Sequence, residues 1–202
     1  MKTIQKTIAI LSIIILIFSC SKDDEPTPTP IAVVYPEENP LPIFLTTTGF
    51  NQQILEGTSS ANSESGFSFR PMVKGKINAL VIKSHRINII RVTIWNKLTE
   101  TVLRTELVDV SAANTEIIKI ITPLELEINK EYVITMNNKY WSDRSRTDSG
   151  VITYPITAGN ISITGSRIIV DGLNQTFPSQ ALLTSYKGDC SFIFQQTASF
   201  TN

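Results

Sequence analysis

The sequence predicts an all-β fold, an antiparallel β-sandwich of the jelly-roll type, behind an N-terminal signal and a tether. Short segments rich in β-branched and aromatic residues alternate apolar and polar side chains with a period of two. Turn-forming clusters separate these segments at short intervals. After the N-terminal apolar run, no segment shows the sustained apolar period of a capped helix. Roughly seven to ten short strands at such spacing are typical of a sandwich or jelly roll.

The clearest strand is PLELEIN, residues 123–129, in which leucine and isoleucine alternate with glutamate and asparagine. The same alternation occurs in IRVTIW, residues 90–95, and in YVITM, residues 132–136. Residues 50–66 are rich in serine, asparagine and glycine, so we expect a mobile loop there. Further short strands are expected at residues 66–69, 76–84, 101–110, 116–121, 160–164, 166–170 and 190–195.

Residues 1–19 are predicted to be a signal peptide. Lys2 and Lys6 precede an apolar stretch from Ile8 to Phe18. This stretch is shorter than the roughly 20 residues that a membrane-spanning helix needs, and it matches the roughly 7 to 15 residues of a signal-peptide apolar region. Cys20 comes directly after residues 1–19 and resembles the lipobox cysteine of bacterial lipoproteins. The resemblance implies that Cys20 is acylated and becomes the first residue of the mature chain.

Residues 20–42 are predicted to hold the lipidated cysteine, an acidic tag and a proline-rich tether. Residues 21–25, SKDDE, resemble the tag by which glycan-harvesting Gram-negative bacteria send lipoproteins to the cell surface; the alternative is an ordinary solvated charge run. The dense prolines between residues 26 and 42 favour extended polyproline II over helix or sheet. Together these features predict an outer-membrane lipoprotein, anchored to the membrane through Cys20 and facing the cell exterior.

Residues 43–202 are expected to form one sandwich domain, because about 160 residues is a normal single-domain length. The whole chain has 18 basic and 18 acidic residues, so it lacks the basic excess expected of a nucleic-acid-binding protein. Cys190 is the only cysteine in this domain, which excludes an internal disulfide. Its apolar neighbours predict a buried, unreactive thiol.

Between about Glu64 and Phe200, a spaced pattern is formed by Gly66, Phe69, Gly75, Ile77, Trp95, Leu126 and Tyr132. This pattern resembles that of a bacterial family of domains of unknown function. The resemblance implies a jelly-roll sandwich of a kind found beside carbohydrate-active or adhesive modules, and it supplies no catalytic residues. Two features depart from the family pattern: Asn129 and Lys130 stand near the usual glycine of a turn, and Thr135 replaces a serine.

The sequence offers little for catalysis, and we expect no enzyme activity, no cofactor and no metal. His85 is the single histidine and lies in a predicted turn. One histidine and one remaining cysteine are too few for a zinc site, and neither a phosphate-binding glycine loop nor a calcium-type Asp-x-Asp-x-Asp run is present. A glycosidase pair of carboxylates stays open as an alternative. The carboxylates expected at strand ends or in loops are Asp109, Glu116, Asp143, Asp148, Asp171 and Asp189.

The candidate ligand site is a predicted loop at residues 137–146, NNKYWSDRSR. The flat faces of Tyr140 and Trp141 can stack on a sugar ring, while amide, carboxylate and guanidinium groups bind its hydroxyls. The alternative is that both rings cap the core of the sandwich. The polar residues of this candidate site are Asn137, Asn138, Asp143, Arg144 and Arg146, and Trp95 is a second aromatic candidate.

The sequence therefore predicts a lipid-anchored surface module that binds a glycan or mediates adhesion without catalysis. The alternative is a docking subunit of an outer-membrane complex, in which an edge strand or the polar face of residues 123–129 contacts a partner protein.

Overall fold

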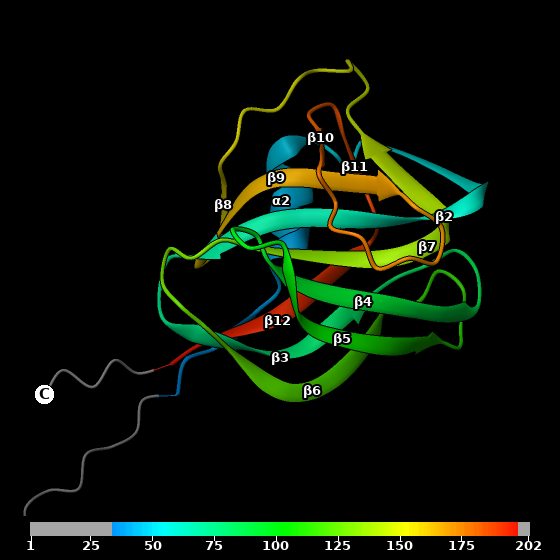
Figure 1. Cartoon of the computed structure of the whole chain (residues 1–202). Coiled ribbons are helices and arrows are strands. Elements are labelled where there is room, and N and C mark those ends of the chain that lie inside the picture. The colour runs from blue at the N-terminus through cyan, green and yellow to red at the C-terminus, as the bar shows by residue number, and fades with distance from the viewer. Residues whose placement is uncertain (1–33, 198–202) are drawn as a thin grey trace, which may run out of the picture. The chain divides into compact units, whose positions relative to one another are not determined.

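The computed structural model describes residues 34–197, which form a sandwich of two antiparallel sheets (Figure 1). The smaller sheet has the strand order β1-β12-β3-β6. The larger sheet has the order β10-β9-β2-β7-β4-β5, with β11 added beside β7 and β8 beside β9. The all-β sandwich predicted from the alternating sequence pattern is confirmed.

The described residues contain twelve strands, of which four are only two or three residues long. The strands of the smaller sheet are β1 (Glu37–Glu38), β12 (Cys190–Gln196), β3 (Gly75–Ile82) and β6 (Ile117–Leu126). Those of the larger sheet are β2 (Gln53–Pro71), β4 (Asn88–Asn96), β5 (Thr101–Val110), β7 (Tyr132–Ser145), β8 (Ile156–Ala158), β9 (Ile161–Val170), β10 (Gln180–Leu182) and β11 (Ser185–Lys187).

The core between the sheets contains a cluster of aromatic rings among a larger number of aliphatic side chains. The ring centroids of Phe67 and Phe69, both on β2, lie 6.0 and 4.6 Å from that of Phe192 on β12. Such tilted aromatic pairs each contribute about 0.5–1.5 kcal/mol beyond the burial of their area. The alternation predicted for residues 90–95 and 132–136 holds on the core side. The core-facing residues of those two segments are Ile90, Val92, Ile94, Tyr132, Ile134 and Met136.

Helix α2 (Pro40–Thr48) begins inside the segment predicted to be a tether. The side chain of Asn39 caps it by accepting a hydrogen bond from the amide of Leu41, at 3.1 Å. Pro40 and Pro42 lie in the first helical turn, where amides have no partner within the helix, so proline is tolerated there. Gly49 ends the helix with a φ of 74°, a left-handed conformation that glycine adopts easily.

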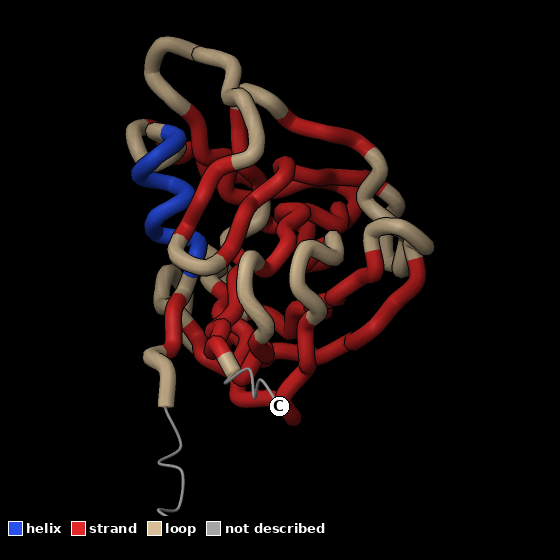
Figure 2. Tube along the Cα trace, turned by 90° about the vertical axis from the view of Figure 1, so that its left-hand side faces the viewer, coloured by secondary structure: helices blue, strands red, loops and turns tan. Residues whose placement is uncertain are grey.

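The compact unit begins at Val33, ahead of the domain start expected at residue 43. Strand β1 pairs with β12, and the ring of Phe44 on α2 is fully buried against Tyr186, with centroids 5.6 Å apart. Figure 2 shows the helix lying against the side of the strands. Proline density describes only the local backbone and does not reveal these tertiary partners. The predicted signal peptide, Cys20 and the acidic tag lie outside the described residues.

Residues 50–66 do not form the mobile loop expected from their composition. Most of them belong to β2, which pairs with β7 and, in its second half, also with β9. The register between β2 and β7 shifts between Thr58 and Ser63, so residues 59–62 bulge out of the ladder. Pairing with β7, joined from Ser63 onward by pairing with β9, orders most of this polar segment, which a composition rule cannot foresee.

The connection from β9 to β10, residues 171–179, crosses the outer face of the larger sheet and is called the strap below (Figure 1). The side-chain nitrogen of Gln175 donates hydrogen bonds to the hydroxyls of Thr93 on β4 and Thr105 on β5, at 3.0 and 2.7 Å. The ring of Phe177 packs edge-on against Trp95, with centroids 5.8 Å apart. Strand β4 is therefore covered on both faces.

Candidate functional site

The predicted ligand loop is in fact the second half of strand β7, up to Ser145. Successive side chains of a strand point to opposite faces, so Tyr140 and Trp141 cannot form one stacking platform. Trp141 lies over Gly57 of β2, with the ammonium of Lys187 5.4 Å from its ring centroid. Tyr140 instead contacts the ring of His85, with centroids 6.0 Å apart.

Three predicted polar residues of this segment are engaged in ion pairs. Asp143 faces Lys187, with 3.5 Å between the carboxylate and the ammonium. Arg144 forms a bidentate, buried pair with Asp189, and Arg146 pairs with Asp148 in an exposed turn. These partners are all protein groups, so the segment does not present its charges together to a ligand.

Trp95 is 2% exposed and is not available as a stacking surface while the strap is in place. Its indole nitrogen donates a hydrogen bond to the hydroxyl of Thr135, at 3.0 Å. Asn137 also lies beneath the strap, where its side-chain nitrogen donates a hydrogen bond to the carbonyl of Gly172 at 3.0 Å. Both residues therefore help to fix the strap.

Two predicted residues, Asn138 and Tyr140, do meet at a surface hollow of about 600 Å³, called the amide hollow below. Its walls come from the bulge of β2, the start of β4, the middle of β7 and the strap. The lining residues are Ser60, Ala61, Asn62, Asn88, Ile89, Asn138, Lys139, Tyr140, Gly172 and Leu173.

The asparagines at the amide hollow are held by one another and by the backbone. Asn88 donates from its amide nitrogen to the side-chain oxygen of Asn138, at 3.0 Å. The same oxygen accepts a 3.0 Å hydrogen bond from the backbone amide of Tyr140. Asn62 donates to the side-chain oxygen of Asn137, at 2.8 Å. Because these contacts fix the amide groups in place, a ligand would not have to order them on binding.

One acceptor of the amide hollow lacks a partner. The side-chain oxygen of Asn88 is buried and accepts no hydrogen bond from any described residue. A buried polar atom left unsatisfied costs about 1–3 kcal/mol. Asn62 and Asn88 were missed by the sequence analysis, since each lies in an unremarkable polar run and only the fold brings them beside β7.

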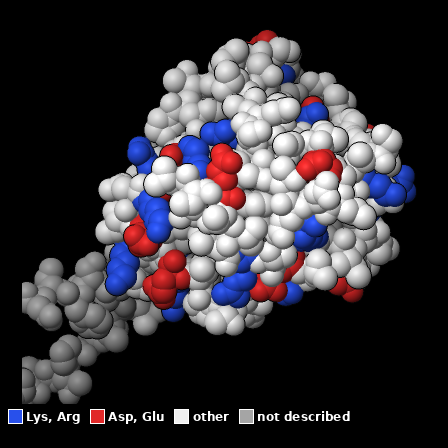
Figure 3. Space-filling view, in the orientation of Figure 1, with Lys and Arg blue, Asp and Glu red and all other residues white. Residues whose placement is uncertain are grey.

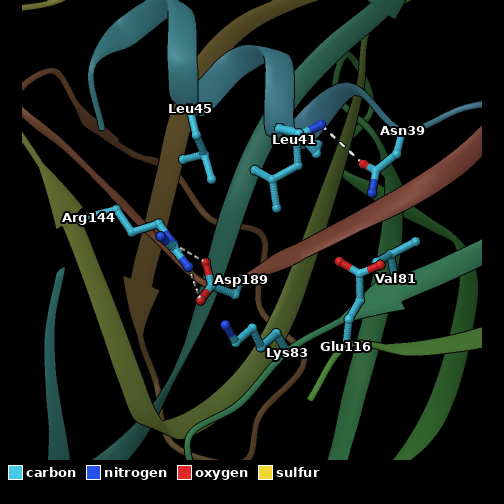
Figure 4. Close-up of a pocket in the computed structure, with 9 residues that line it drawn as sticks. Asn39, Leu41, Leu45, Val81, Lys83, Glu116, Arg144 and Asp189 are labelled. Atoms are coloured by element: carbon cyan, nitrogen blue, oxygen red, sulfur yellow. Dashed lines mark hydrogen bonds and ion pairs between the residues drawn. The ribbon is translucent and has the colours of Figure 1, made fainter. Parts of the chain in front are cut away.

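A second pocket of about 200 Å³, called the helix pocket below, lies between α2 and the smaller sheet (Figure 4). The bidentate pair of Arg144 and Asp189 forms one end of it, with 2.9 Å between Nη2 and Oδ2. The residues that line this pocket are Asn39, Leu41, Pro42, Leu45, Val81, Lys83, Glu116, Arg144 and Asp189.

Several of the candidate carboxylates are engaged by other protein groups. Asp189 is tied to Arg144 and Asp143 to Lys187, as described above. The hydrogen bond from Arg146 lowers the pKa of Asp148 to about 2, and hydrogen bonds from Thr176 and Asn174 lower that of Asp171, so neither is a proton donor near neutral pH. Asp109 lies in β5 and Glu116 lines the helix pocket.

No family model and no curated protein sequence matches the chain. The resemblance to a family of domains of unknown function therefore stays a prediction.

Across residues 34–197, no three His, Cys, Asp or Glu side chains cluster in a way that would hold a metal ion. Nor does this part of the chain contain a helix that is long and apolar enough to cross a membrane. Figure 3 shows basic and acidic side chains intermixed on the visible face, without an extended patch of one sign.

Proposed function

We propose that the protein is a lipid-anchored surface module that binds glycans in the amide hollow and performs no chemistry on them. The observation that carries this proposal is a hollow of about 600 Å³ lined by asparagine amides that are held in place by hydrogen bonds, with Tyr140 beside them. Sugar hydroxyls both donate and accept hydrogen bonds, and asparagine side chains offer both functions without a charge. The hollow suits a neutral or weakly charged saccharide better than a highly charged ligand.

The size of the amide hollow supports the same ligand class. Its volume of about 600 Å³ lies within the range of roughly 300–1,000 Å³ that is usual for small-ligand sites. Tyr140 contributes the aromatic ring, and the ammonium of Lys139 lies 5.3 Å from its centroid. Lys139 is exposed, so its flexible side chain can move aside when a sugar approaches the ring.

Glycan-array binding tests this proposal. Tyr140→Ala and Asn88→Ala should each weaken binding about tenfold or more, equivalent to about 1.4 kcal/mol. Trp141→Ala is the matched control, because it removes the neighbouring aromatic ring from the opposite face of β7. Equal loss in all three variants, or no loss in the first two, would reject the amide hollow as the glycan site.

The membrane anchor is proposed from the sequence alone, since Cys20 lies outside the described residues. Cys20→Ser should move the protein from the membrane fraction to the soluble fraction after cell lysis, because it removes the acyl attachment point. Protease treatment of intact cells then tests whether the anchored form faces outward. Retention of the serine variant in membranes would contradict lipidation at this residue.

A docking role is the second candidate, and one observation favours it. Strand β6 is the outer strand of the smaller sheet, and Ile118 and Ile120 on it are 57% and 83% exposed. An apolar edge strand with free backbone groups is suited to pairing with a strand of another protein. Detergent-solubilised protein should then retain a stoichiometric partner that Ile120→Lys releases. Absence of any such partner favours the glycan proposal.

A further inference from the structure

The helix pocket combines an apolar wall with two opposite charges. Figure 4 shows Leu41 and Leu45 pointing from α2 into the pocket, while Lys83 and Glu116 reach into it from the smaller sheet. Val81 of β3 also lines the pocket. A molecule seated here would contact hydrocarbon on one side and charged groups on the other.

The positions of Lys83 and Glu116 follow from the register of the smaller sheet. Ile82 of β3 pairs with Ile117 of β6, which brings the next residue along β3, Lys83, beside the residue before β6, Glu116. Neither side chain forms an ion pair or a side-chain hydrogen bond within residues 34–197. One positive and one negative group are thus left facing the pocket without a partner there.

The other two charged residues of the helix pocket are paired with each other. Both carboxylate oxygens of Asp189 accept from the guanidinium of Arg144, and both side chains are almost fully buried. Two parallel N–H···O bonds fix this pair as a rigid wall. Lys83 ends near this pair, whereas the carboxylate of Glu116 stands on the other side of the pocket (Figure 4). The pocket is therefore dipolar although its four charges sum to zero.

From this arrangement we infer that the helix pocket binds a small zwitterion, a free α-amino acid with an apolar side chain. Lys83 binds the carboxylate, Glu116 binds the ammonium, and Leu41, Leu45 and Val81 contact the side chain. A volume of about 200 Å³ is below the roughly 300 Å³ at which drug-sized ligands begin to fit, so the ligand has the size of a single residue. This site is separate from the amide hollow and does not depend on it.

Calorimetric titration with leucine, N-acetyl-leucine and leucinamide tests the inference. The second ligand lacks the ammonium and the third lacks the carboxylate, so each should bind about fivefold more weakly than leucine, as expected for one partly exposed ion pair. Lys83→Gln should weaken leucine and N-acetyl-leucine but leave leucinamide unchanged. Glu116→Gln should weaken leucine and leucinamide but leave N-acetyl-leucine unchanged.

Lys76→Gln and Glu125→Gln are the matched controls, because these two residues are paired in register on the same two strands, away from the pocket. Both should bind leucine like the parent, as should Tyr140→Ala of the amide hollow. Thermal denaturation of every variant confirms that it is folded. Absence of leucine binding at millimolar concentration, or binding that survives both Lys83→Gln and Glu116→Gln, would overturn the inference.

Discussion

At the scale of single residues, two glycines of β2 show how differently the same residue type can be constrained. A methyl group at Gly66 would overlap the carbonyl oxygen of Ile134 in the neighbouring strand. A methyl group at Gly57 would overlap the ring of Trp141, which is partly exposed. Backbone in the middle of a sheet cannot yield, whereas a side chain at the surface can turn away.

We expect Gly66→Ala to lower the free energy of unfolding by about 1–3 kcal/mol or more, as overpacking usually does. Gly57→Ala should cost clearly less, because only the indole must move. Urea denaturation of both variants measures the difference. A larger loss for Gly57→Ala would mean that the ring of Trp141 is fixed more firmly than the strand pairing.

Glu64 is the most deeply buried acid of the larger sheet, at 1% exposure. Its carboxylate accepts hydrogen bonds from Arg91 and Thr135, at 2.5 and 2.8 Å. Burial raises the pKa of Glu64 above its ordinary value, although Arg91 and Thr135 act in the opposite direction. The folded protein therefore holds this proton more tightly than the unfolded chain does.

This pKa shift predicts a definite pH dependence. The stabilisation that a protonated Glu64 provides is fully present below its unfolded pKa, near 4.5, and is lost as the pH rises through the folded pKa. Glu64→Gln mimics the protonated form at every pH. The unfolding free energy of the glutamine variant, minus that of the parent, should thus increase as the pH rises from about 4.5. A decrease would show that Arg91 dominates and lowers the pKa.

At the scale of elements, the strap is held over the larger sheet by a small number of side-chain hydrogen bonds. Arg91 donates to the strap carbonyls of Leu173 and Asn174, each at 2.7 Å. Leu173 also lines the amide hollow, so the strap connects the buried polar groups of the sheet with the candidate glycan site.

The cover that the strap forms over Trp95 can be measured by fluorescence. In a Trp141→Phe background Trp95 is the single tryptophan, and Phe177→Ala should make it more accessible to acrylamide and shift its emission to the red. The loss of stability should be about 1–2 kcal/mol, below the roughly 3–5 kcal/mol of a core phenylalanine, because Phe177 is only partly buried. Leu173→Ala, which alters an exposed side chain of the same strap, should leave the quenching unchanged. Unchanged quenching after Phe177→Ala would contradict this view of the strap.

At the scale of the whole molecule, the start of the folded unit is the feature that decides how the chain can be shortened. Asn39 caps α2 and also accepts a hydrogen bond from Ser191 of β12, at 2.6 Å. Residues 37 and 38 add a strand to the smaller sheet. A cut at the boundary predicted from proline density would remove all three residues.

A chain that begins at residue 33 should therefore melt at the same temperature as the full-length protein. A chain that begins at residue 43 should melt at a lower temperature, since loss of the helix cap alone costs about 1 kcal/mol. Circular dichroism melts of the two chains make the comparison. Equal melting temperatures would mean that β1 and the cap contribute nothing measurable.

Much of the fold follows from the sequence because period-two alternation is a local signal. The core faces of β4 and β7 can be read from IRVTIW and YVITM, in which Ile90, Val92, Ile94, Ile134 and Met136 are buried in the core. Across the two strands, Val92 lies opposite Met136 and Ile94 lies opposite Ile134. The candidate site does not follow in this way. Tyr140 and Trp141 are adjacent in sequence but lie on opposite faces, whereas Asn88 and Asn138 are fifty residues apart and share a hydrogen bond.

The sequence by itself determined the all-β class, the alternating core faces and the burial of Cys190, because each depends on the apolar or polar character of neighbouring residues. Tertiary structure alone decided that α2 packs against the strands through Phe44, that β2 is ordered, and that Trp95 is covered. It also decided which asparagines line the amide hollow and which charges face the helix pocket. Each of these outcomes depends on a partner supplied by a distant segment, and no local pattern encodes which segment that will be.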